Sequence, residues 1–205
     1  MKPIYDTVIF DLGGVLIDWN PEYLYRKIFN DEKQMQHFLT EVCHGAWNKE
    51  QDRGRLFVEA VRERTERFPE HAANIRAYHE RWDEMLGGAI EENVAVLEDL
   101  RQRPDIHLYA ITNWSAETFP VAQQRFPFLG YFEDTVVSGE LKLVKPDPKI
   151  YQTLLDRQPI VPEQAIFIDD VQENVVGAEA LGIRGIHLTL ETDLRKELVA
   201  LGVLN

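Results

Sequence analysis

The sequence predicts an α/β fold in which helices cover both faces of a parallel five-stranded sheet. Five short apolar runs are rich in β-branched and aromatic residues, as expected of strands that are buried on both faces. Helical patterns separate the last four runs, and this alternation is typical of a parallel sheet. The predicted strands are residues 5–10, 107–111, 134–137, 165–168 and 185–188.

Segments before and between the later strands carry the signals of amphipathic helices. "IEENVAVLEDLRQR" places Val94, Leu97 and Leu100 on one face, with acids early and arginines late, which suits the helix dipole. In "DPKIYQTLLDRQ", Asp147 is the predicted N-cap and Pro148 the first helical residue.

Residues 21–88 interrupt the alternation and contain no convincing strand. Four stretches read as amphipathic helices: "PEYLYRKIF", "DEKQMQHFLTEVC", "GRLFVEAVRERTERF" and "HAANIRAYHERWDEML". We therefore expect a Rossmann-like core formed by residues 1–18 and 89–205, with a helical bundle, residues 19–88, inserted as a cap.

Composition restricts the classes of function. The 205-residue chain is 44% hydrophobic, and its 35 acidic and 22 basic residues give a formal charge of −13, which argues against nucleic-acid binding. A single cysteine, Cys43, excludes an intrachain disulfide and suits a reducing compartment. Without a signal peptide or a membrane span, we expect a cytoplasmic protein, either a monomer or a homodimer.

Polar side chains follow four of the predicted strands. In a parallel sheet the carboxyl ends of the strands share one edge, where ligands bind. Three carboxylates, a hydroxyl, an amide and a lysine are expected to meet there. They are Asp11, Thr112, Asn113, Lys145, Asp169 and Asp170.

This set of groups suits phosphoryl transfer. Two carboxylates about 4 Å apart repel each other by roughly 4 kcal/mol at an effective dielectric constant near 20, so three would protonate or recruit a cation. Carboxylate oxygens favour Mg²⁺, which also accepts a substrate phosphate as a ligand. A carboxylate can attack phosphorus and form an aspartyl-phosphate, while Thr112 and Lys145 cover the remaining phosphoryl oxygens.

Four ordered motifs carry a resemblance to the haloacid dehalogenase-like (HAD) hydrolase superfamily. They are "VIFDLGGVL", "LYAITNW", "LVKPDPKIY" and "IFIDDVQENVVGAEALGI", and they span nearly the whole chain. The helical insert after the first motif matches the cap position of subfamily I. The first motif, with its Asp-Leu-Gly, looks like that of the subfamily's sugar-phosphate phosphatases.

The resemblance implies a role for each matching residue. Asp11 would be the nucleophile and a metal ligand, and Gly13 would offer its backbone carbonyl to Mg²⁺. Asp170 would be a further ligand, with Asp169 beside it either on the metal or behind it. Thr112, Asn113 and Lys145 would bind the phosphoryl group of a small phosphorylated metabolite. For Asn174, which also matches a family position, we expect only a structural role at a helix start.

The first motif departs from the pattern of most phosphatases in the family. These have a second acid two residues after the nucleophile, which protonates the leaving group, whereas this chain has Gly13. Either the leaving group needs little protonation, or Asp18, His44 or Asp52 supplies the proton. Two other functions stay open: a metal-independent haloacid dehalogenase, and a binding protein that has lost the chemistry.

Substrate contacts from the cap are expected in "CHGAWNKEQDRGRLF", with Trp47 and Arg53 as candidates. The alternative for Trp47 is packing inside the cap, and for Arg53 it is a surface ion pair. Cys43 is expected to be a buried, small hydrophobic residue.

Overall fold

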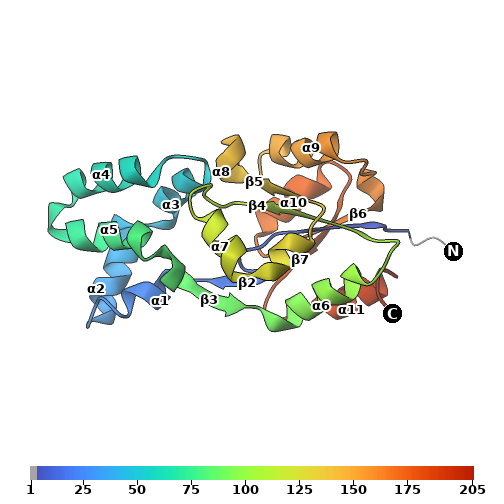
Figure 1. Cartoon of the computed structure of the whole chain (residues 1–205), viewed down its shortest axis with the longest axis horizontal. Helices are drawn as coiled ribbons and strands as arrows, with labels where there is room; N and C mark the ends of the chain where they lie inside the picture. The colour runs from blue at the N-terminus through green and yellow to red at the C-terminus, as the bar shows by residue number, and fades with distance from the viewer. Residues whose placement is uncertain (1–3) are drawn as a thin grey trace.

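A sheet of five parallel strands forms the centre of the computed structural model, which describes residues 4–205 (Figure 1). The strands are β1 (Thr7–Phe10), β4 (His107–Thr112), β5 (Asp134–Val137), β6 (Ala165–Asp169) and β7 (Arg184–His187). They pair in the order β5-β4-β1-β6-β7, so β1 is central. Each predicted strand is present within two residues of its expected ends, and the predicted fold class is confirmed.

Successive residues of the strands point into two different cores. Val8 and Phe10 of β1 belong to one apolar cluster, whereas Ile9 belongs to the other. Helices α6 (Glu91–Arg101), α7 (Phe119–Arg125) and α11 (Leu194–Ala200) cover the first face, and α9 (Pro148–Arg157) and α10 (Gln172–Glu179) cover the second. The strands are buried on both sides for this reason, which explains their continuous apolar runs.

The start of α9 follows from its sequence. The side chain of Asp147 accepts a hydrogen bond from the backbone N–H of Lys149 at 3.0 Å, and Pro148 is the first helical residue. This cap fixes the end of the loop that precedes α9. A short helix, α8 (Ser138–Leu141), lies at the beginning of that loop, directly after β5.

Five helices lie together to one side of the sheet (Figure 1). They are α1 (Glu22–Tyr25), α2 (Glu32–His37), α3 (Gly45–Asp52), α4 (Phe57–Arg67) and α5 (Ala72–Glu80), and a π-helical segment, Phe38–Val42, continues α2. Four were expected, and α3 is the additional one. Its sequence "GAWNKEQD" is mostly polar and buries only Trp47 and Gln51, so no apolar stripe marks it as a helix.

A two-stranded antiparallel ribbon connects the sheet with these helices. It pairs β2 (Ile17–Trp19) with β3 (Leu86–Ala89). The expectation that residues 21–88 contain no strand is therefore wrong for 86–88. The ribbon strands are short, and β3 contains two glycines, so neither shows the alternation that identifies a strand. The expected limits of the cap, residues 19 and 88, fall inside this ribbon, and the domain division stays a prediction.

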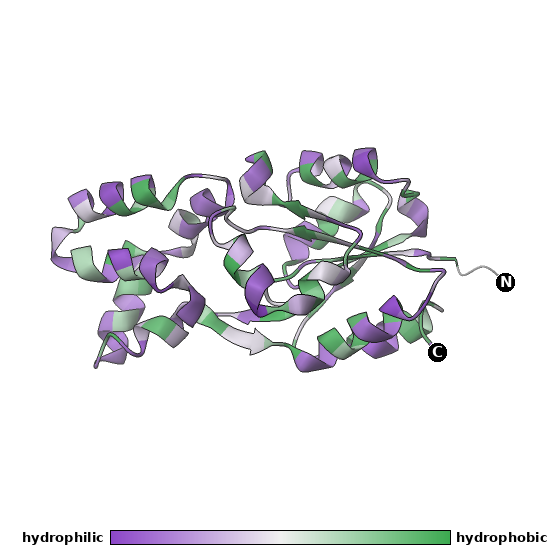
Figure 2. Ribbon diagram, in the orientation of Figure 1, coloured by the Kyte–Doolittle hydropathy of each residue, from purple (hydrophilic) through white to green (hydrophobic). Residues whose placement is uncertain are grey.

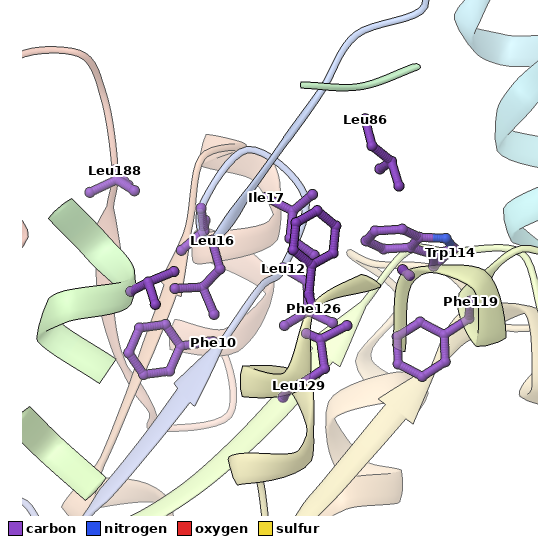
Figure 3. Close-up of a cluster of buried hydrophobic side chains, with 14 of the residues drawn as sticks. Phe10, Leu12, Leu16, Ile17, Leu86, Trp114, Phe119, Phe126, Leu129 and Leu188 are labelled. Atoms are coloured by element: carbon purple, nitrogen blue, oxygen red, sulfur yellow. The ribbon is translucent and has the colours of Figure 1, made fainter. Parts of the chain in front are cut away.

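One apolar cluster continues from the sheet into the inserted helices. It includes Phe10 in β1, Ile17 and Leu86 in the ribbon, and Tyr25 and Tyr78 among the helices. Figure 3 shows part of the cluster, and in this view Leu12 and Ile17 lie between Phe10 on one side and Trp114 and Phe119 on the other. The inserted helices are thus packed on the edge of the sheet at which β1 ends.

The part of the chain that the structure describes also contains four short 3-10 helices: Pro69–His71, Trp82–Met85, Pro127–Tyr131 and Pro162–Gln164. The helices carry both hydrophilic and hydrophobic residues along their length, as Figure 2 shows by colour. Among residues 4–205, no helix combines the length and the apolar character that crossing a bilayer requires.

Gly139 in α8 allows α8 to approach the loop after β4. A Cβ at this position would lie 2.5 Å from the backbone nitrogen of Ala116 and 2.8 Å from the carbonyl oxygen of Trp114. Gly139→Ala should therefore lower the free energy of unfolding by about 1–3 kcal/mol, because backbone atoms must move. Urea unfolding measures the change. Gly130→Ala is the control, since its Cβ would meet nothing within 4 Å; equal stability of the two variants would contradict the prediction.

Candidate active site

The carboxyl ends of three neighbouring strands bring polar side chains together. Asp11 follows β1, Thr112 is the last residue of β4, and Asp169 is the last residue of β6. Lys145 reaches the same place from the loop before α9. The expected meeting of these groups at one edge of the sheet is what the structure shows.

The ammonium group of Lys145 lies between two carboxylates. Its Nζ is 2.9 Å from Oδ1 of Asp11 and 2.7 Å from Oδ2 of Asp169, and it donates to the carbonyl oxygen of Ile111 at 2.9 Å. The Lys145 side chain is 0% exposed. Burial alone would lower the pKa of Lys145, but Asp11 and Asp169 outweigh it and raise the pKa. Lys145 is therefore a fixed positive charge.

Asp169 is held by donors on both of its carboxylate oxygens. Oδ1 accepts from the backbone N–H of Val171 at 2.8 Å, and Nδ2 of Asn174 lies 3.0 and 3.1 Å from the two oxygens. Asn174 thus does more than begin a helix, which is all that was expected of it. One feature of the sequence could have indicated this contact. Asn174 follows Asp169 by five residues, across a strand end and the first turn of α10.

Asn113 connects the loop after β4 with the loop that carries Lys145. Its side-chain Oδ1 accepts from the backbone N–H of Lys145 at 2.8 Å, and its Nδ2 donates to the carbonyl oxygen of Lys145 at 3.2 Å. The amide thereby fixes the backbone on which the buried ammonium is mounted. Thr112, in contrast, is buried at the strand end and does not line the cavity described below.

Asp170 completes a group of three carboxylates. Asp11, Asp169 and Asp170 can each offer one oxygen such that all three oxygens lie within 4.8 Å of one another. Gly14 lies directly against Asp170, because a Cβ on Gly14 would be 2.3 Å from its Oδ2. Gly14 also has a φ of +74°, a conformation that favours glycine.

The carboxylates outnumber the local positive charge. Burial raises the pKa of Asp11 to about 7, with Lys145 opposing the shift and Asp169 adding to it. Burial and the repulsion from Asp169 also raise the pKa of Asp170. One ammonium does not compensate three carboxylates, so a further cation would relieve the repulsion. Clustered carboxylate oxygens are the ligands that Mg²⁺ prefers, and this donor set fits that ion.

A cavity of about 250 Å³ opens from Asp11 toward the inserted helices. Its wall contains four aromatic side chains and several polar ones. The aromatic residues are Trp19, Phe57, Trp82 and Trp114, and the polar residues include Asn48, Asp52, Asn113, Ser115 and Thr118. Gly13 and Asp170 also line it, so the cavity joins the carboxylate cluster to a surface suited to an organic group with polar substituents.

The two residues expected to contact substrate from the cap lie outside the lining of this cavity. Trp47 is 5% exposed and packs edge-on against Tyr78, with ring centroids 5.0 Å apart. Nε of Arg53 lies 3.6 Å from Oε1 of Glu50 at the surface. A role for either in substrate binding stays a prediction. Cys43 is buried, as expected, and burial raises the pKa of its thiol to about 12.

The three candidate proton donors differ in position. Asp18 accepts a hydrogen bond from the hydroxyl of Tyr23 at 2.5 Å, and Nδ1 of His44 accepts from the backbone N–H of Trp47 at 3.1 Å. Neither lines the cavity, whereas Asp52 does. Burial raises the pKa of Asp52 to about 8, although Lys49 and the backbone amide of Ser115 oppose the shift.

Comparisons with known proteins agree with the resemblance carried by the four sequence motifs. A family model described as haloacid dehalogenase-like hydrolase matches residues 5–182. A phosphorylated carbohydrates phosphatase of Thermotoga maritima is 28% identical over 190 residues, which cover 89% of this chain and 84% of the relative. A D-ribitol-5-phosphate phosphatase of Bacteroides thetaiotaomicron is 20% identical over 95% of this chain and 97% of its own length.

A solved structure has the same fold. It is a HAD family enzyme from Bacteroides thetaiotaomicron in complex with magnesium and inorganic phosphate, and it matches with a TM-score of 0.70 at 23% identity. The match covers 94% of this chain and 98% of that one. At this identity the likeness establishes the fold.

Removing the buried ammonium should destabilise the chain in a pH-dependent way. In EDTA at pH 8, Lys145→Met should lower the free energy of unfolding by about 3 kcal/mol, because Asp11 and Asp169 lose their partner. The loss should be smaller at pH 5. Burial already raises the pKa of Asp11, and without the ammonium it rises further, so Asp11 binds a proton in the folded state and the cost grows only as the pH increases. Urea unfolding at both pH values measures it. Lys149→Met, an exposed change on α9, is the control, and a pH-independent loss would contradict this account.

Proposed function

The chain belongs to the haloacid dehalogenase-like hydrolases, whose family model matches residues 5–182, and we propose that it is a magnesium-dependent phosphatase acting on a small organic phosphate. The observation that carries the proposal is the position of Asp11. Asp11 lines the cavity, and its carboxylate lies within reach of Lys145 and beside Asp170.

Asp11 is the proposed nucleophile. Oδ1 accepts from the backbone N–H of Leu12 at 2.7 Å and lies 2.9 Å from Nζ of Lys145, so the carboxylate is held in one orientation. The other oxygen attacks phosphorus and forms an aspartyl-phosphate, which water then hydrolyses. Fixing the nucleophile in advance lowers the entropic part of the barrier.

Asp11, Asp170 and the backbone carbonyl of Gly13 are the proposed protein ligands of Mg²⁺. When bound, the ion neutralises the carboxylates and withdraws charge from the phosphoryl oxygens. Asp169 has donors on both oxygens, which supports a role behind the metal, where it orients Lys145.

Lys145, Asn113 and Thr112 are the proposed phosphoryl-binding residues. Lys145 supplies the positive charge, and Asn113 lines the cavity while it anchors the backbone of Lys145. Thr112 is buried at the end of β4 beside these two residues, and its proposed contact is the hydroxyl. Together they stabilise the negative charge that develops on the transferred group.

A phosphorylated carbohydrate is the substrate class that we favour. Two relatives carry names of carbohydrate or polyol phosphate phosphatases. The cavity offers flat aromatic walls beside the polar side chains of Asn48, Ser115 and Thr118, which suits a molecule with both C–H faces and hydroxyl groups.

A magnesium titration with nitrophenyl phosphate tests the proposal. Turnover should require Mg²⁺ and should fall by at least about 10³-fold in Asp11→Asn, because the amide cannot form the acyl phosphate. Turnover of chloropropionate in EDTA would instead indicate a dehalogenase. No turnover across a panel of carbohydrate and other metabolite phosphates would indicate a binding protein.

Gly14 provides a test of the metal site that substitutes none of the proposed ligand residues. Gly14→Ala puts a methyl group where Oδ2 of Asp170 now lies, so the magnesium concentration for half-maximal activity should rise about tenfold or more. Gly202→Ala is the matched control for backbone strain, since Gly202 has a φ of +73° but a Cβ there meets nothing within 4 Å. Unchanged magnesium dependence in Gly14→Ala would argue against Asp170 as a ligand.

A further inference from the structure

We propose that Asp52, at the end of α3, is the catalytic residue that protonates the leaving group, in place of the acid that is absent at Gly13. This inference rests on the proposed phosphatase function and adds a residue to it. Three observations carry it: the position of Asp52 in the wall of the cavity, its anchoring to the catalytic loops, and the charges that surround it.

A proton donor is needed because an alkoxide is a poor leaving group. When Asp11 attacks a carbohydrate phosphate, the bond between phosphorus and the carbohydrate oxygen breaks, and that oxygen must gain a proton as it leaves. Gly13 offers no side chain, and the space where its Cβ would lie is open within 4 Å. The donor must therefore come from another wall of the cavity.

Asp52 lies in the same cavity as Asp11 and is attached to the core. Nδ2 of Asn48, one helical turn earlier, donates to Oδ2 of Asp52 at 3.1 Å and orients the carboxyl group. The hydroxyl of Ser138 lies 2.5 Å from the carbonyl oxygen of Asp52 and accepts from the backbone N–H of Trp114 at 2.9 Å. One serine thus joins the end of α3 to the loop that follows β4.

A second contact brings the turn after α3 against α8. Gly54 has a φ of +96°, and a Cβ on it would lie 2.7 Å from the carbonyl oxygen of Gly139. The chain therefore requires a glycine two residues after Asp52 so that α3 can end against the core. This close approach holds the end of α3 against α8, although α3 belongs to the inserted helices.

Burial keeps the carboxyl group of Asp52 neutral at pH 7. Burial is the main cause that raises its pKa to about 8, and the charge of Asp11 contributes to the same shift. Lys49 on α3 and the backbone amide of Ser115 act in the opposite direction, and the neighbouring Tyr78 on α5 is itself neutral because burial raises its pKa. A neutral carboxyl group near its pKa can both give and recover a proton.

The proton transfers balance over the two steps. In the first, Asp11 forms its bond to phosphorus, the bond to the leaving oxygen breaks, and the Asp52 carboxyl proton moves to that oxygen. In the second, water attacks the aspartyl-phosphate, Asp11 leaves as a carboxylate, and Asp52 takes the proton that the water loses. Asp52 is then a neutral acid again, as before the reaction.

The test compares leaving groups, using kcat/KM because it reports the transfer to Asp11. For alkyl phosphates such as glycerol phosphate, Asp52→Asn should lower kcat/KM by about 10²–10⁴-fold. For dinitrophenyl phosphate, whose leaving group needs no proton, the loss should be less than about tenfold by the same principle. Glu50→Gln, an exposed change on the same helix, is the control for effects of α3 on folding.

Two further measurements separate catalysis from structure. With alkyl phosphates, kcat/KM of the natural chain should fall as the pH rises through about 8, because Asp52 loses its proton, and this limb should be absent in Asp52→Asn. Adding Gly13→Asp to Asp52→Asn should restore part of the activity on alkyl phosphates, since the new side chain enters open space.

Each failure has a distinct signature. Equal losses for alkyl and dinitrophenyl phosphates, or a rise in KM alone, would overturn the proposal and assign Asp52 to substrate binding. An unchanged rate on alkyl phosphates would overturn it as well. Full activity of Asp11→Asn would instead contradict the phosphatase mechanism itself, independently of Asp52.

Discussion

The ammonium group of Lys145 connects the ends of three adjacent strands. It contacts Asp11 after β1, the carbonyl oxygen of Ile111 in β4, and Asp169 at the end of β6, all within 2.9 Å. Taking an ammonium and two carboxylates out of water costs several kcal/mol per ion, which only close and complete pairing can offset. The surrounding donors, from Val171 and Asn174 to Asp169 and from Leu12 to Asp11, supply that pairing. The arrangement of the site therefore depends on one side chain.

The single ammonium group of Lys145 does not neutralise all the carboxylates of the site. Lys145 can balance one of the three clustered carboxylates, and the pKa values of Asp11 and Asp170 are raised first by burial and then by repulsion from Asp169. Such repulsion weakens the folded state, but under the proposed function it would favour a divalent cation and a substrate that brings its own ligand to that cation. A chain with a formal charge of −13 would in this way bind a phosphate ester, because the attraction is local. The carboxylates that would bind the cation are therefore the same groups whose mutual repulsion destabilises the folded chain.

The fold and most of the site could be predicted because both follow from local patterns. Apolar runs identified the five strands, and parallel topology placed Asp11, Lys145 and Asp169 at one edge. The ribbon of β2 and β3 and the helix α3 were missed, since short or polar elements are stabilised by tertiary packing and leave no periodic signal. The contact of Asn174 with Asp169 and the presence of Asp52 in the cavity could not be predicted for a related reason. Both depend on how separate elements pack, and Asp18, His44 and Asp52 were equivalent candidates until α3 was placed.

Placing the proton donor on the inserted helices changes what those helices contribute. An acid at Gly13 would stay beside Asp11 in every conformation, whereas Asp52 stays there only while the end of α3 is attached to Ser138 and Gly139. The β2–β3 ribbon is the covalent connection, and it contains two consecutive glycines, Gly87 and Gly88. If the helices move about this ribbon, they carry Asp52 away from Asp11. Under the proposed mechanism, protonation of the leaving group would then require the helices to be packed over a bound substrate, and the aspartyl-phosphate would form only from substrates that allow this packing. The glycine in the first motif would thereby make the inserted helices part of the proposed chemical step as well as of substrate selection.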